Sequence, residues 1–382
     1  MTAVTRIKTA IIGCGAISDI YLQNMTSRFQ ILDLVACSDR HQDRADAKAA
    51  KYGIKSMTID DVFADPDIQL IVNLTPPLAH YEMVKRAILA NKNVYTEKVL
   101  AVTYAQAKEL IALARDHHVL IGSAPDTFLG AGIQSGKRAV DEGLIGQVTS
   151  VHVAVNRDMR HLYNPHSFTG KTGGGIGFDV GVYYLTALLS ILGPVAEVGG
   201  LAENFHPDHT IEDPASPLFG DKFTVENENM MVGYLRFKNN VLGTLHFNSD
   251  AIWPEQPAVV LYGREGILAL PDPNRFDGQV RLYEKGALNP IEIPQNFGYA
   301  KNARGLGAAD LAWSIVNHRQ PRASAEMAAH AVEILNGILA ATKSGQRQTM
   351  TSDFVIPKAM PIGYLGDYFG RSEEAALALK EE

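Results

Sequence analysis

The first third of the chain alternates between short apolar runs and amphipathic stretches, and this alternation restricts the fold more than any other feature of the sequence. The apolar runs, of a length typical of buried strands, read IKTAIIG, DLVACSD, IQLIVNLT, NVYTEK and VLIGSA. Helical periodicity separates them, as in AQAKELIALARDHH, where Ala107, Leu110 and Ala114 recur on one helix face. Strands that are apolar at nearly every position indicate a parallel sheet with helices on both faces. We therefore predict an α/β domain over residues 1–125.

After Pro125 the pattern changes to a succession of strands. MMVGYLRF and VLGTLHFNS flank Lys238-Asn239-Asn240, which predicts a hairpin, and AVVLYG and GILALP predict a second pair. Helices are expected near 176–192 and again within 305–343. Strands in a run, with helices elsewhere, predict a second domain of the α+β class over residues 126–382, built on a largely antiparallel sheet.

Composition excludes several classes of protein. The chain has 382 residues, a net charge of −7 and no block of like charges, which argues against nucleic-acid binding and against a polybasic membrane patch. Its two cysteines, Cys14 and Cys37, are expected to be buried, reduced thiols, and we find no zinc-site spacing. The N-terminal MTAVTRIKTA lacks an apolar signal region, and no stretch reaches membrane-spanning length, so we expect a cytoplasmic protein.

The sequence GCGAIS lies between the first predicted strand and helix, and it matches a phosphate-binding turn. Gly13 permits the tight turn, Gly15 lets the backbone approach a pyrophosphate at the helix N-terminus, and Ser18 is small enough for close packing. The match alone also fits an ordinary strand-to-helix turn. Asp39, which is 24 residues after Gly15, ends the second strand, where an acid hydrogen-bonds the ribose hydroxyls. The combination predicts a Rossmann-type dinucleotide-binding domain.

The expected cofactor is NAD, because the Asp39 carboxylate repels a 2'-phosphate. Arg40 leaves NADP open, since it can stack on adenine, pair with a 2'-phosphate or simply be solvated. The residues predicted to bind the cofactor are Gly13, Gly15, Ala16, Ile17, Asp39, Arg40, Thr75, Pro76, His80, Glu97 and Lys98.

Two further motifs point to chemistry beside that cofactor. YTEK places Glu97 and Lys98 at the carboxyl end of a strand, where ligands of open α/β sheets bind. A lysine there can donate to a substrate hydroxyl or stabilise an alkoxide, although a surface lysine is the alternative. In GGGIGFDVGVYYLTALLSILG, a helical wheel puts Gly181, Leu185, Leu188, Leu189 and Leu192 on one face and Asp179, Tyr183 and Thr186 on the other. A polar face without Lys or Glu is unlike an ordinary solvated surface.

Together these residues resemble the Gfo/Idh/MocA family of oxidoreductases, and the resemblance covers nearly the whole chain. It is carried by GCGAIS, the TPP turn, Glu97-Lys98 and GGGIGFDVGVYYL. It implies an N-terminal Rossmann domain and a C-terminal domain with a large, mostly antiparallel open sheet. Because that sheet usually serves subunit contact in the family, the resemblance also implies a homodimer or homotetramer.

The chain departs from the family pattern at two places. Val99 stands where the family often has proline. Tyr183 and Thr186 stand where many members have histidine and aspartate. The tyrosine resembles the glucose–fructose oxidoreductase and dihydrodiol dehydrogenase branch, so a histidine-based mechanism is not carried over.

The resemblance and the residues together predict an NAD(P)-dependent oxidoreductase acting on a secondary hydroxyl or carbonyl of a sugar, sugar derivative or cyclic polyol. Lys98, Asp179 and Tyr183 are the predicted catalytic residues. Tyr183 would exchange the hydroxyl proton, and Lys98 would lower its pKa from the ordinary value of about 10. Asp179 would orient Lys98 or hold a second hydroxyl.

Substrate contacts are expected in the loop NRDMRHLYNPHSF, although its polar residues are equally consistent with an ordinary loop. The predicted substrate-binding residues are Lys98, Arg157, Arg160, His161, His166, Asp179 and Tyr183. Arg304, in ARGLG, either approaches the site or caps the next helix.

Two alternatives remain open. One is a lyase or hydrolase acting on glycosides that retains its NAD and oxidises a sugar carbon only transiently, and the sequence does not separate it from a dehydrogenase. The other is a non-catalytic regulator that binds dinucleotide and sugar. Such a regulator would be expected to lose the lysine or the Asp–Tyr pair, and this chain has both.

Overall fold

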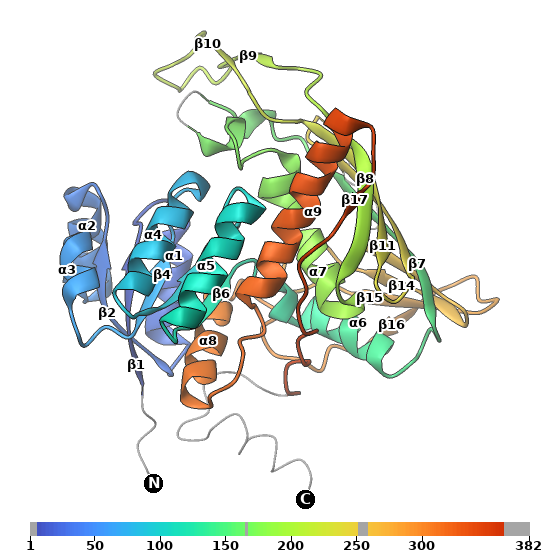
Figure 1. The fold of residues 1–382 in the computed structure, drawn as a ribbon, viewed down its shortest axis with the longest axis horizontal. Helices are drawn as coiled ribbons and strands as arrows, with labels where there is room; N and C mark the ends of the chain where they lie inside the picture. Colours follow the sequence, from blue (N-terminus) through green and yellow to red (C-terminus); the bar gives the residue numbers. More distant parts are fainter. Residues whose placement is uncertain (1–5, 165–166, 251–258, 363–382) are drawn as a thin grey trace, which may run out of the picture.

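A computed structural model describes residues 6–164, 167–250 and 259–362, which form two units side by side (Figure 1). The first unit is a six-stranded sheet in the order β3-β2-β1-β4-β5-β6, and every pairing in it is parallel. Its strands are β1 (Ile7–Ile12), β2 (Leu32–Ser38), β3 (Lys55–Ser56), β4 (Leu70–Asn73), β5 (Asn93–Thr96) and β6 (Ile121–Ser123). The predicted parallel sheet is confirmed. The strand order reverses between β1 and β4, which opens a crevice at the carboxyl ends of these strands.

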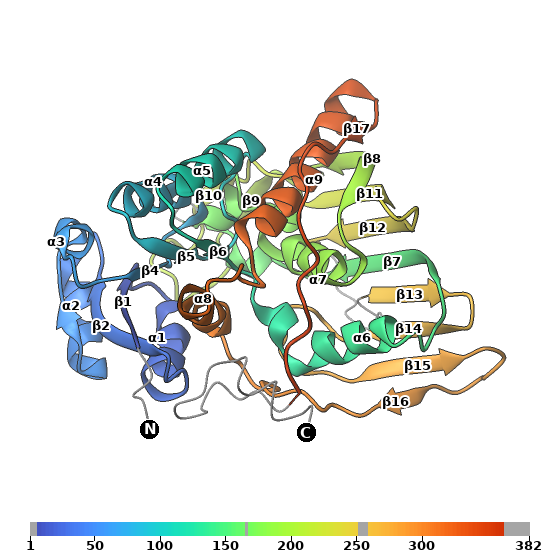
Figure 2. The same ribbon diagram turned by 60° about the horizontal axis from the view of Figure 1, so that its bottom comes forward.

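Helices cover both faces of this sheet, with α4 and α5 on one side and α1 on the other (Figure 2). They are α1 (Ser18–Ser27), α2 (Gln42–Tyr52), α3 (Ile59–Ala64), α4 (Pro77–Leu89) and α5 (Tyr104–Asp116). The sequence predicted all of them except the short α3. Gly53 ends α2 in the left-handed conformation, as a glycine after a helix should. Cys14 and Cys37 are buried free thiols, as predicted.

The second unit is a nine-stranded sheet in the order β16-β15-β14-β13-β7-β12-β11-β8-β17. Its strands are β7 (Val148–Asn156), β8 (Val195–Glu203), β11 (Met230–Phe237), β12 (Leu242–Asn248), β13 (Val259–Gly263), β14 (Gly266–Leu270), β15 (Val280–Glu284), β16 (Ile291–Ile293) and β17 (Gln348–Thr349). The β7–β12 pair is parallel and the other pairings are antiparallel. The two predicted hairpins, β11–β12 and β13–β14, are confirmed.

Helices α6 (Ala131–Asp141), α7 (Val182–Leu192) and α9 (Ala325–Ser344) pack against one face of the large sheet (Figure 2). Helix α8 (Leu306–Val316) returns to the first unit, where it contacts β5 and β6. The larger of two buried apolar clusters therefore extends through both units. In the described ranges, no helix combines the length and the apolar character needed to cross a bilayer.

The predicted helix near 176–192 is not regular along its whole length. It begins with a π-helical turn, Gly177–Gly181, and only then continues as α7. A wheel of 100° per residue therefore does not describe its first turn. Tyr183 and Thr186 are buried, with 8% and 4% of their surface exposed, so their side of the helix faces protein rather than water. The wider turn presents Asp179 toward the first unit, where it meets Lys98.

A small hairpin, β9 (Asp208–Thr210) with β10 (Lys222–Thr224), extends beyond the sheet (Figure 1).

Candidate active site

The glycine turn after β1 has the shape that a phosphate needs. Gly13 has a φ of +107°, and a Cβ there would lie 2.7 Å from the carbonyl carbon of Leu74, so only glycine fits. A Cβ on Gly15 would meet nothing within 4 Å, which leaves its backbone open to a ligand. Ala16 and Ile17, just before α1, are exposed. An open backbone at a helix N-terminus suits a pyrophosphate, so this turn fits a dinucleotide.

Asp39 lies at the end of β2 and is tied to the glycine turn. One carboxylate oxygen accepts the Cys14 N–H at 2.7 Å and the other accepts the His41 N–H at 2.9 Å. A carboxylate has about four lone-pair positions, so both oxygens can still accept ribose hydroxyls. Arg40 is exposed and its Nε donates to His41 Nε2 at 3.1 Å. Its place beside Asp39 leaves its predicted role open.

His80 is held between two turns of the first unit. Its ring is fully buried in α4, and its two nitrogens lie 2.6 Å from the backbone oxygens of Thr75 and Val99. Both polar atoms are therefore occupied, and they tie the turn after β4 to the turn after β5. His80 thus supports the two turns at the carboxyl edge of the sheet, and its contact with a cofactor stays a prediction. Pro76 is exposed at the N-cap of α4, next to Thr75.

Glu97 also points inward. Its carboxylate accepts the Tyr21 hydroxyl at 2.6 Å and the Lys98 N–H at 3.0 Å, and only 9% of the residue is exposed. Glu97 therefore fixes the backbone from which Lys98 projects. The sequence motif located this pair correctly at the strand end but did not show that the two side chains point in different directions.

Lys98 and Asp179 form the central ion pair between the two units. The Lys98 ammonium donates to the backbone oxygen of Asp179 at 2.7 Å and also to its carboxylate. The two side chains are only 11% and 12% exposed. Burial lowers the pKa of Lys98, but Asp179 and Tyr183 outweigh it, so the pKa of the ammonium is raised. Lys98 is therefore positively charged throughout the neutral range.

Tyr183 completes the group. The Lys98 Nζ lies 5.5 Å from the centre of its ring and 5.9 Å from that of Phe168. The sequence predicted a lowered pKa for Tyr183, and this is wrong in sign: burial raises the pKa, and Lys98 and Arg304 only partly oppose it. The phenol is therefore protonated at neutral pH. Desolvation depends on tertiary packing, which the sequence pattern did not reveal.

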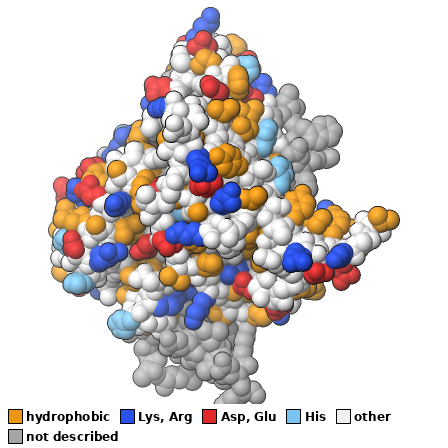
Figure 3. Space-filling model, turned by 45° about the vertical axis from the view of Figure 1, so that its right-hand side comes forward, with side chains coloured by type: hydrophobic (Ala, Val, Ile, Leu, Met, Phe, Trp, Pro, Cys, Tyr) orange, Lys and Arg blue, Asp and Glu red, His pale blue; other side chains and the backbone are white. Residues whose placement is uncertain are grey.

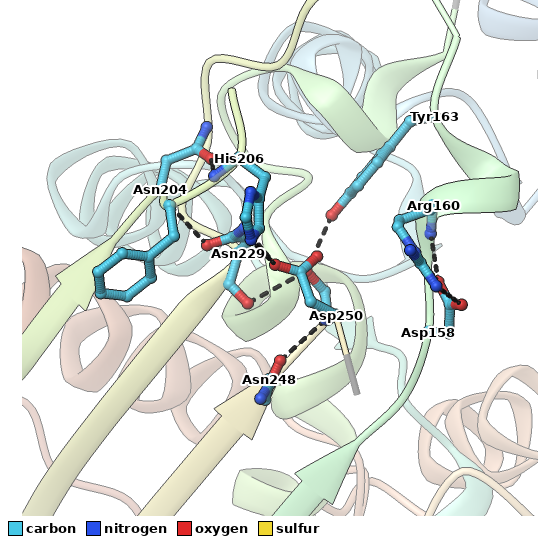
Figure 4. A network of polar contacts seen from close by, with 10 residues as sticks. Asp158, Arg160, Tyr163, Asn204, His206, Asn229, Asn248 and Asp250 are labelled. Atoms are coloured by element: carbon cyan, nitrogen blue, oxygen red, sulfur yellow. Dashed lines mark hydrogen bonds and ion pairs between the residues drawn. The ribbon is translucent and has the colours of Figure 1, made fainter. Parts of the chain in front are cut away.

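The predicted substrate loop is only partly brought to this group. Arg160 pairs with Asp158, through Nε at 2.9 Å and Nη2 at 2.6 Å, so its charge is already neutralised (Figure 4). Arg157 is exposed, and its charge acts on Tyr184, the neighbour of Tyr183. The side chain of His161, and the whole of His166, lie outside the described residues.

Figure 4 shows the polar contacts that connect this loop to the large sheet. Tyr163 donates to Ser249 at 3.1 Å, and Asn229 donates to the Asp250 carboxylate at 2.6 Å. The Asp250 N–H in turn donates to Asn248 at 2.8 Å. This network joins the loop to the ends of β11 and β12, so the loop is anchored to the large sheet.

Glu228 is a partly buried acid beside the site, and the sequence did not indicate it. A Cβ on Gly175 would lie 2.3 Å from its Oε1, so the glycine run leaves room for this carboxyl group. Oε1 is buried and has no hydrogen-bond partner. Burial raises the pKa of Glu228 to about 7, although its own N–H and that of Gly177 favour the charged form. No motif marks the sequence ENEN, and only the fold places it against the turn that carries Asp179.

Glu228→Gln is expected to stabilise the protein in alkaline solution. The folded pKa is about 7 against an ordinary 4.5, so the folded state holds the proton more tightly. The protonated carboxyl group of Glu228 therefore contributes to the free energy of unfolding, fully below pH 4.5, and this contribution is lost as the pH rises through 7. Because glutamine does not ionise, the variant should gain on the order of 2–3 kcal/mol above neutral pH and nothing in acid. Denaturant unfolding across pH measures this, with exposed Glu226→Gln as the control. An equal effect at all pH values would contradict the assignment.

The geometry defines a class of protein: a Rossmann-type NAD-binding domain joined to a sheet domain that supplies Asp179 and Tyr183. Comparison with known families agrees with this class. The model described as "Oxidoreductase family, NAD-binding Rossmann fold" matches residues 7–124, and the GFO/IDH/MocA C-terminal domain model matches residues 133–269. The chain therefore belongs to the GFO/IDH/MocA family of oxidoreductases.

Individual relatives are more distant. An uncharacterised oxidoreductase of Escherichia coli, YhhX, is 29% identical over 47% of this chain and 52% of its own length. The D-glucoside 3-dehydrogenase of Escherichia coli is 28% identical over 61% of this chain and 67% of its own length. Some of these relatives are thus matched over only about half of their length. A solved levoglucosan dehydrogenase with NADH superposes with a TM-score of 0.79 at 16% identity, covering 90% of this chain and 99% of that one, which shows a shared fold.

Proposed function

We propose that the protein is an NAD-dependent oxidoreductase that interconverts a secondary hydroxyl and a carbonyl on a sugar, sugar derivative or cyclic polyol. The observation that carries the proposal is the buried group of Lys98, Asp179 and Tyr183, which lies at the carboxyl edge of the NAD-binding sheet. Relatives whose names denote action on D-glucosides and on 1,5-anhydro-D-fructose support a carbohydrate substrate.

The glycine turn and Asp39 would hold the cofactor, with the pyrophosphate at the start of α1 and the ribose at the end of β2. When bound, NAD supplies the hydride acceptor or donor. The chain itself supplies the proton chemistry. Tyr183 is protonated at neutral pH, so it can give a proton to the oxygen of a carbonyl that is being reduced. In the reverse direction the acceptor is the phenolate form of Tyr183, which takes up the proton of the substrate hydroxyl and becomes the neutral phenol again.

Lys98 would bind the reacting oxygen. An ammonium has three N–H donors. Lys98 uses two of them for the backbone oxygen and the carboxylate of Asp179. One donor therefore remains for a substrate. A charged, buried donor of this kind stabilises a developing alkoxide, because the low dielectric of the site strengthens the interaction. Asp179 is the residue that keeps Lys98 in place.

We also propose that the open face of the nine-stranded sheet joins copies of the chain. Leu201, Tyr234, Leu242 and Tyr262 are exposed apolar residues on β8, β11, β12 and β13, and their register places them all on one face. Figure 3, which turns the sheet side forward, shows hydrophobic side chains between charged ones. Such a face suits a subunit interface. Analytical ultracentrifugation should give at least a dimer, and a monomer at micromolar concentration would contradict this.

The proposed function is tested by following NADH absorbance with a panel of aldoses, glycosides, anhydrosugars and inositols. NAD and NADP are compared in parallel, and the reverse reaction is tested with the corresponding ketosugars. Turnover is expected with at least one member of the panel, and with NAD in preference to NADP because of the Asp39 carboxylate. Dinucleotide binding without turnover on any member would overturn the proposal.

A further inference from the structure

We propose that Phe168 is the wall against which the substrate ring stacks, so that the site selects a cyclic substrate with an apolar C–H face over an open-chain one. The inference deepens the proposed function and rests on it, because it takes Lys98 as the donor to the reacting oxygen. Phe168 is the last residue of NRDMRHLYNPHSF, and it is not among the substrate contacts predicted from that sequence.

The ring of Phe168 lies next to the ammonium of the site. Its centre is 5.9 Å from Lys98 Nζ, and the centre of the Tyr183 ring is 5.5 Å from the same atom. Both distances are within the range in which a cation interacts with an aromatic ring. Tyr183 is only 8% exposed, whereas Phe168 is half-buried. Phe168 is therefore the aromatic ring of this group that a ligand can more easily reach.

The backbone that carries this ring is held in place. Residues Phe168–Gly170 form a short 3₁₀ helix, and the side-chain amide of Asn227 donates to the carbonyl oxygen of Thr169 at 2.6 Å. Asn227 is itself buried and precedes β11. A Cβ on Gly174 would collide with the Phe168 carbonyl oxygen, so the glycine run packs directly against this turn. The ring is thus presented by backbone fixed between the large sheet and the turn that leads to Asp179.

The side chains around Lys98 differ in what they offer a ligand. Lys98, Asp179 and Tyr183 carry polar groups, whereas the Phe168 ring offers no hydrogen bond. A ligand that matches both needs a hydroxyl edge and an apolar face. A pyranose or cyclohexane ring with equatorial hydroxyl groups has this shape, because its oxygens point outward and its axial C–H bonds cover its faces. The negative face of an aromatic ring attracts such C–H groups, and an open-chain polyol has no comparable face.

The distances allow both contacts at once. A substrate oxygen that accepts a hydrogen bond from Lys98 lies about 3 Å from its Nζ. The centre of the Phe168 ring is 5.9 Å from the same Nζ. A six-membered ring that carries this oxygen therefore comes within the roughly 4.5–7 Å at which packed rings lie. Phe168 takes no proton and carries no charge. It determines specificity by orienting the substrate ring while Lys98 binds the oxygen.

The test compares the binding of cyclic and open-chain probes to the full chain loaded with NADH, a state in which an alcohol cannot be oxidised. The cyclic probes are methyl β-D-glucopyranoside and scyllo-inositol, whose ring hydroxyl groups are all equatorial, and the open-chain probe is D-glucitol. Titration calorimetry gives Kd, and saturation-transfer NMR shows which C–H groups of the bound glucoside touch the protein. We expect a cyclic probe to bind about fivefold or more tightly than D-glucitol, with saturation concentrated on one face of its ring.

Three variants identify the aromatic face as the cause. Phe168→Leu keeps an apolar side chain but removes the flat ring, so it should weaken cyclic binding by about 5–10-fold, make the saturation even and leave D-glucitol unchanged. Phe168→Tyr keeps the ring and should bind as the wild type does. The matched control is Phe219→Leu, since Phe219 is 59% exposed in the loop between β9 and β10. If Phe168→Leu does not fold, Phe168→Met takes its place in the same comparison.

The outcomes separate this inference from the proposed function. Equal affinity of the wild type and Phe168→Leu for the cyclic probes would overturn the role of Phe168, and so would a lack of binding by either cyclic probe. A loss in Phe168→Tyr as large as that in Phe168→Leu would also overturn it, because the ring face would then not be what binds. Absence of turnover on the whole sugar panel would overturn the proposed function while leaving these binding results intact. If the protein is active, Phe168→Leu should raise KM for a cyclic substrate by the same factor and leave KM for NAD unchanged.

Discussion

Lys98→Met is expected to lower kcat by about 10²–10³-fold while the affinity for NAD changes little. The reason is that, in the proposed mechanism, Lys98 supplies the charged donor to the reacting oxygen, and methionine fills the same space without a charge. Steady-state kinetics on the best member of the sugar panel measures kcat, and fluorescence titration measures NAD affinity. Exposed Lys108→Met, on α5, is the matched control and should behave as the wild type.

A second variant guards against a purely structural effect. Methionine leaves the Asp179 carboxylate without its partner in a site where it is only 12% exposed, and this also destabilises the fold. Lys98→Arg keeps the positive charge beside Asp179, but the planar guanidinium cannot place a donor where the ammonium did. This variant should unfold near the wild-type midpoint and still lose most of its activity. An Arg or Met variant with more than about a tenth of wild-type kcat would contradict the assigned role.

Gly13→Ala is expected to destabilise the protein by about 2–4 kcal/mol and to abolish measurable NAD binding. Its φ of +107° disfavours any side chain, and the new Cβ would lie 2.7 Å from the Leu74 carbonyl carbon and 2.8 Å from its oxygen. These are backbone atoms of the adjacent turn, so they cannot move aside cheaply. Because β1 and β4 flank the crevice, the displaced turn would no longer present its N–H groups to a pyrophosphate.

Gly53→Ala separates the two causes of this effect. Gly53 also has a positive φ, +67°, but a Cβ there would meet nothing within 4 Å. Gly53→Ala should therefore lower the free energy of unfolding by about 1 kcal/mol, through backbone strain alone, and leave NAD binding unchanged. Denaturant unfolding and NAD titration of both variants give the comparison. If the two alanines cost the same and both proteins bind NAD, the close approach of the glycine turn to Leu74 is not important.

The sequence predicted those parts of the site that depend on local pattern. Apolar strands followed by turns located the carboxyl edge of the parallel sheet, and GCGAIS, Asp39 and Lys98 all lie on it. The sequence also indicated that Asp179 and Tyr183 belong to one helical segment. In each case the motif follows directly from its own strand or helix, so its place along the chain did not depend on tertiary packing.

The remaining features arise from contacts between distant segments. The ring nitrogens of His80 contact the backbone oxygens of Thr75 and Val99, which only the fold brings to either side of it. Burial decides whether the pKa of Tyr183 is raised or lowered, and this burial exists only once the helix is packed against the rest of the fold. Arg304 and Glu228 lie far along the chain from Lys98. A regular helical wheel also cannot anticipate the π-helical turn that directs Asp179 toward Lys98.

The central claim is that the chain transfers hydride from a carbohydrate carbon to NAD, and deuterium tracing tests it most directly. A sugar or polyol deuterated at its carbinol carbons is incubated with the full-length protein and NAD, and the cofactor is analysed by mass spectrometry. Our account predicts deuterated NADH released into solution, at a rate about 10²–10³-fold lower with Lys98→Met. NAD that binds but gains no deuterium from any substrate would contradict the account. Deuterium that appears only in protein-bound cofactor, with a cleaved sugar as product, would identify the retained-cofactor lyase instead.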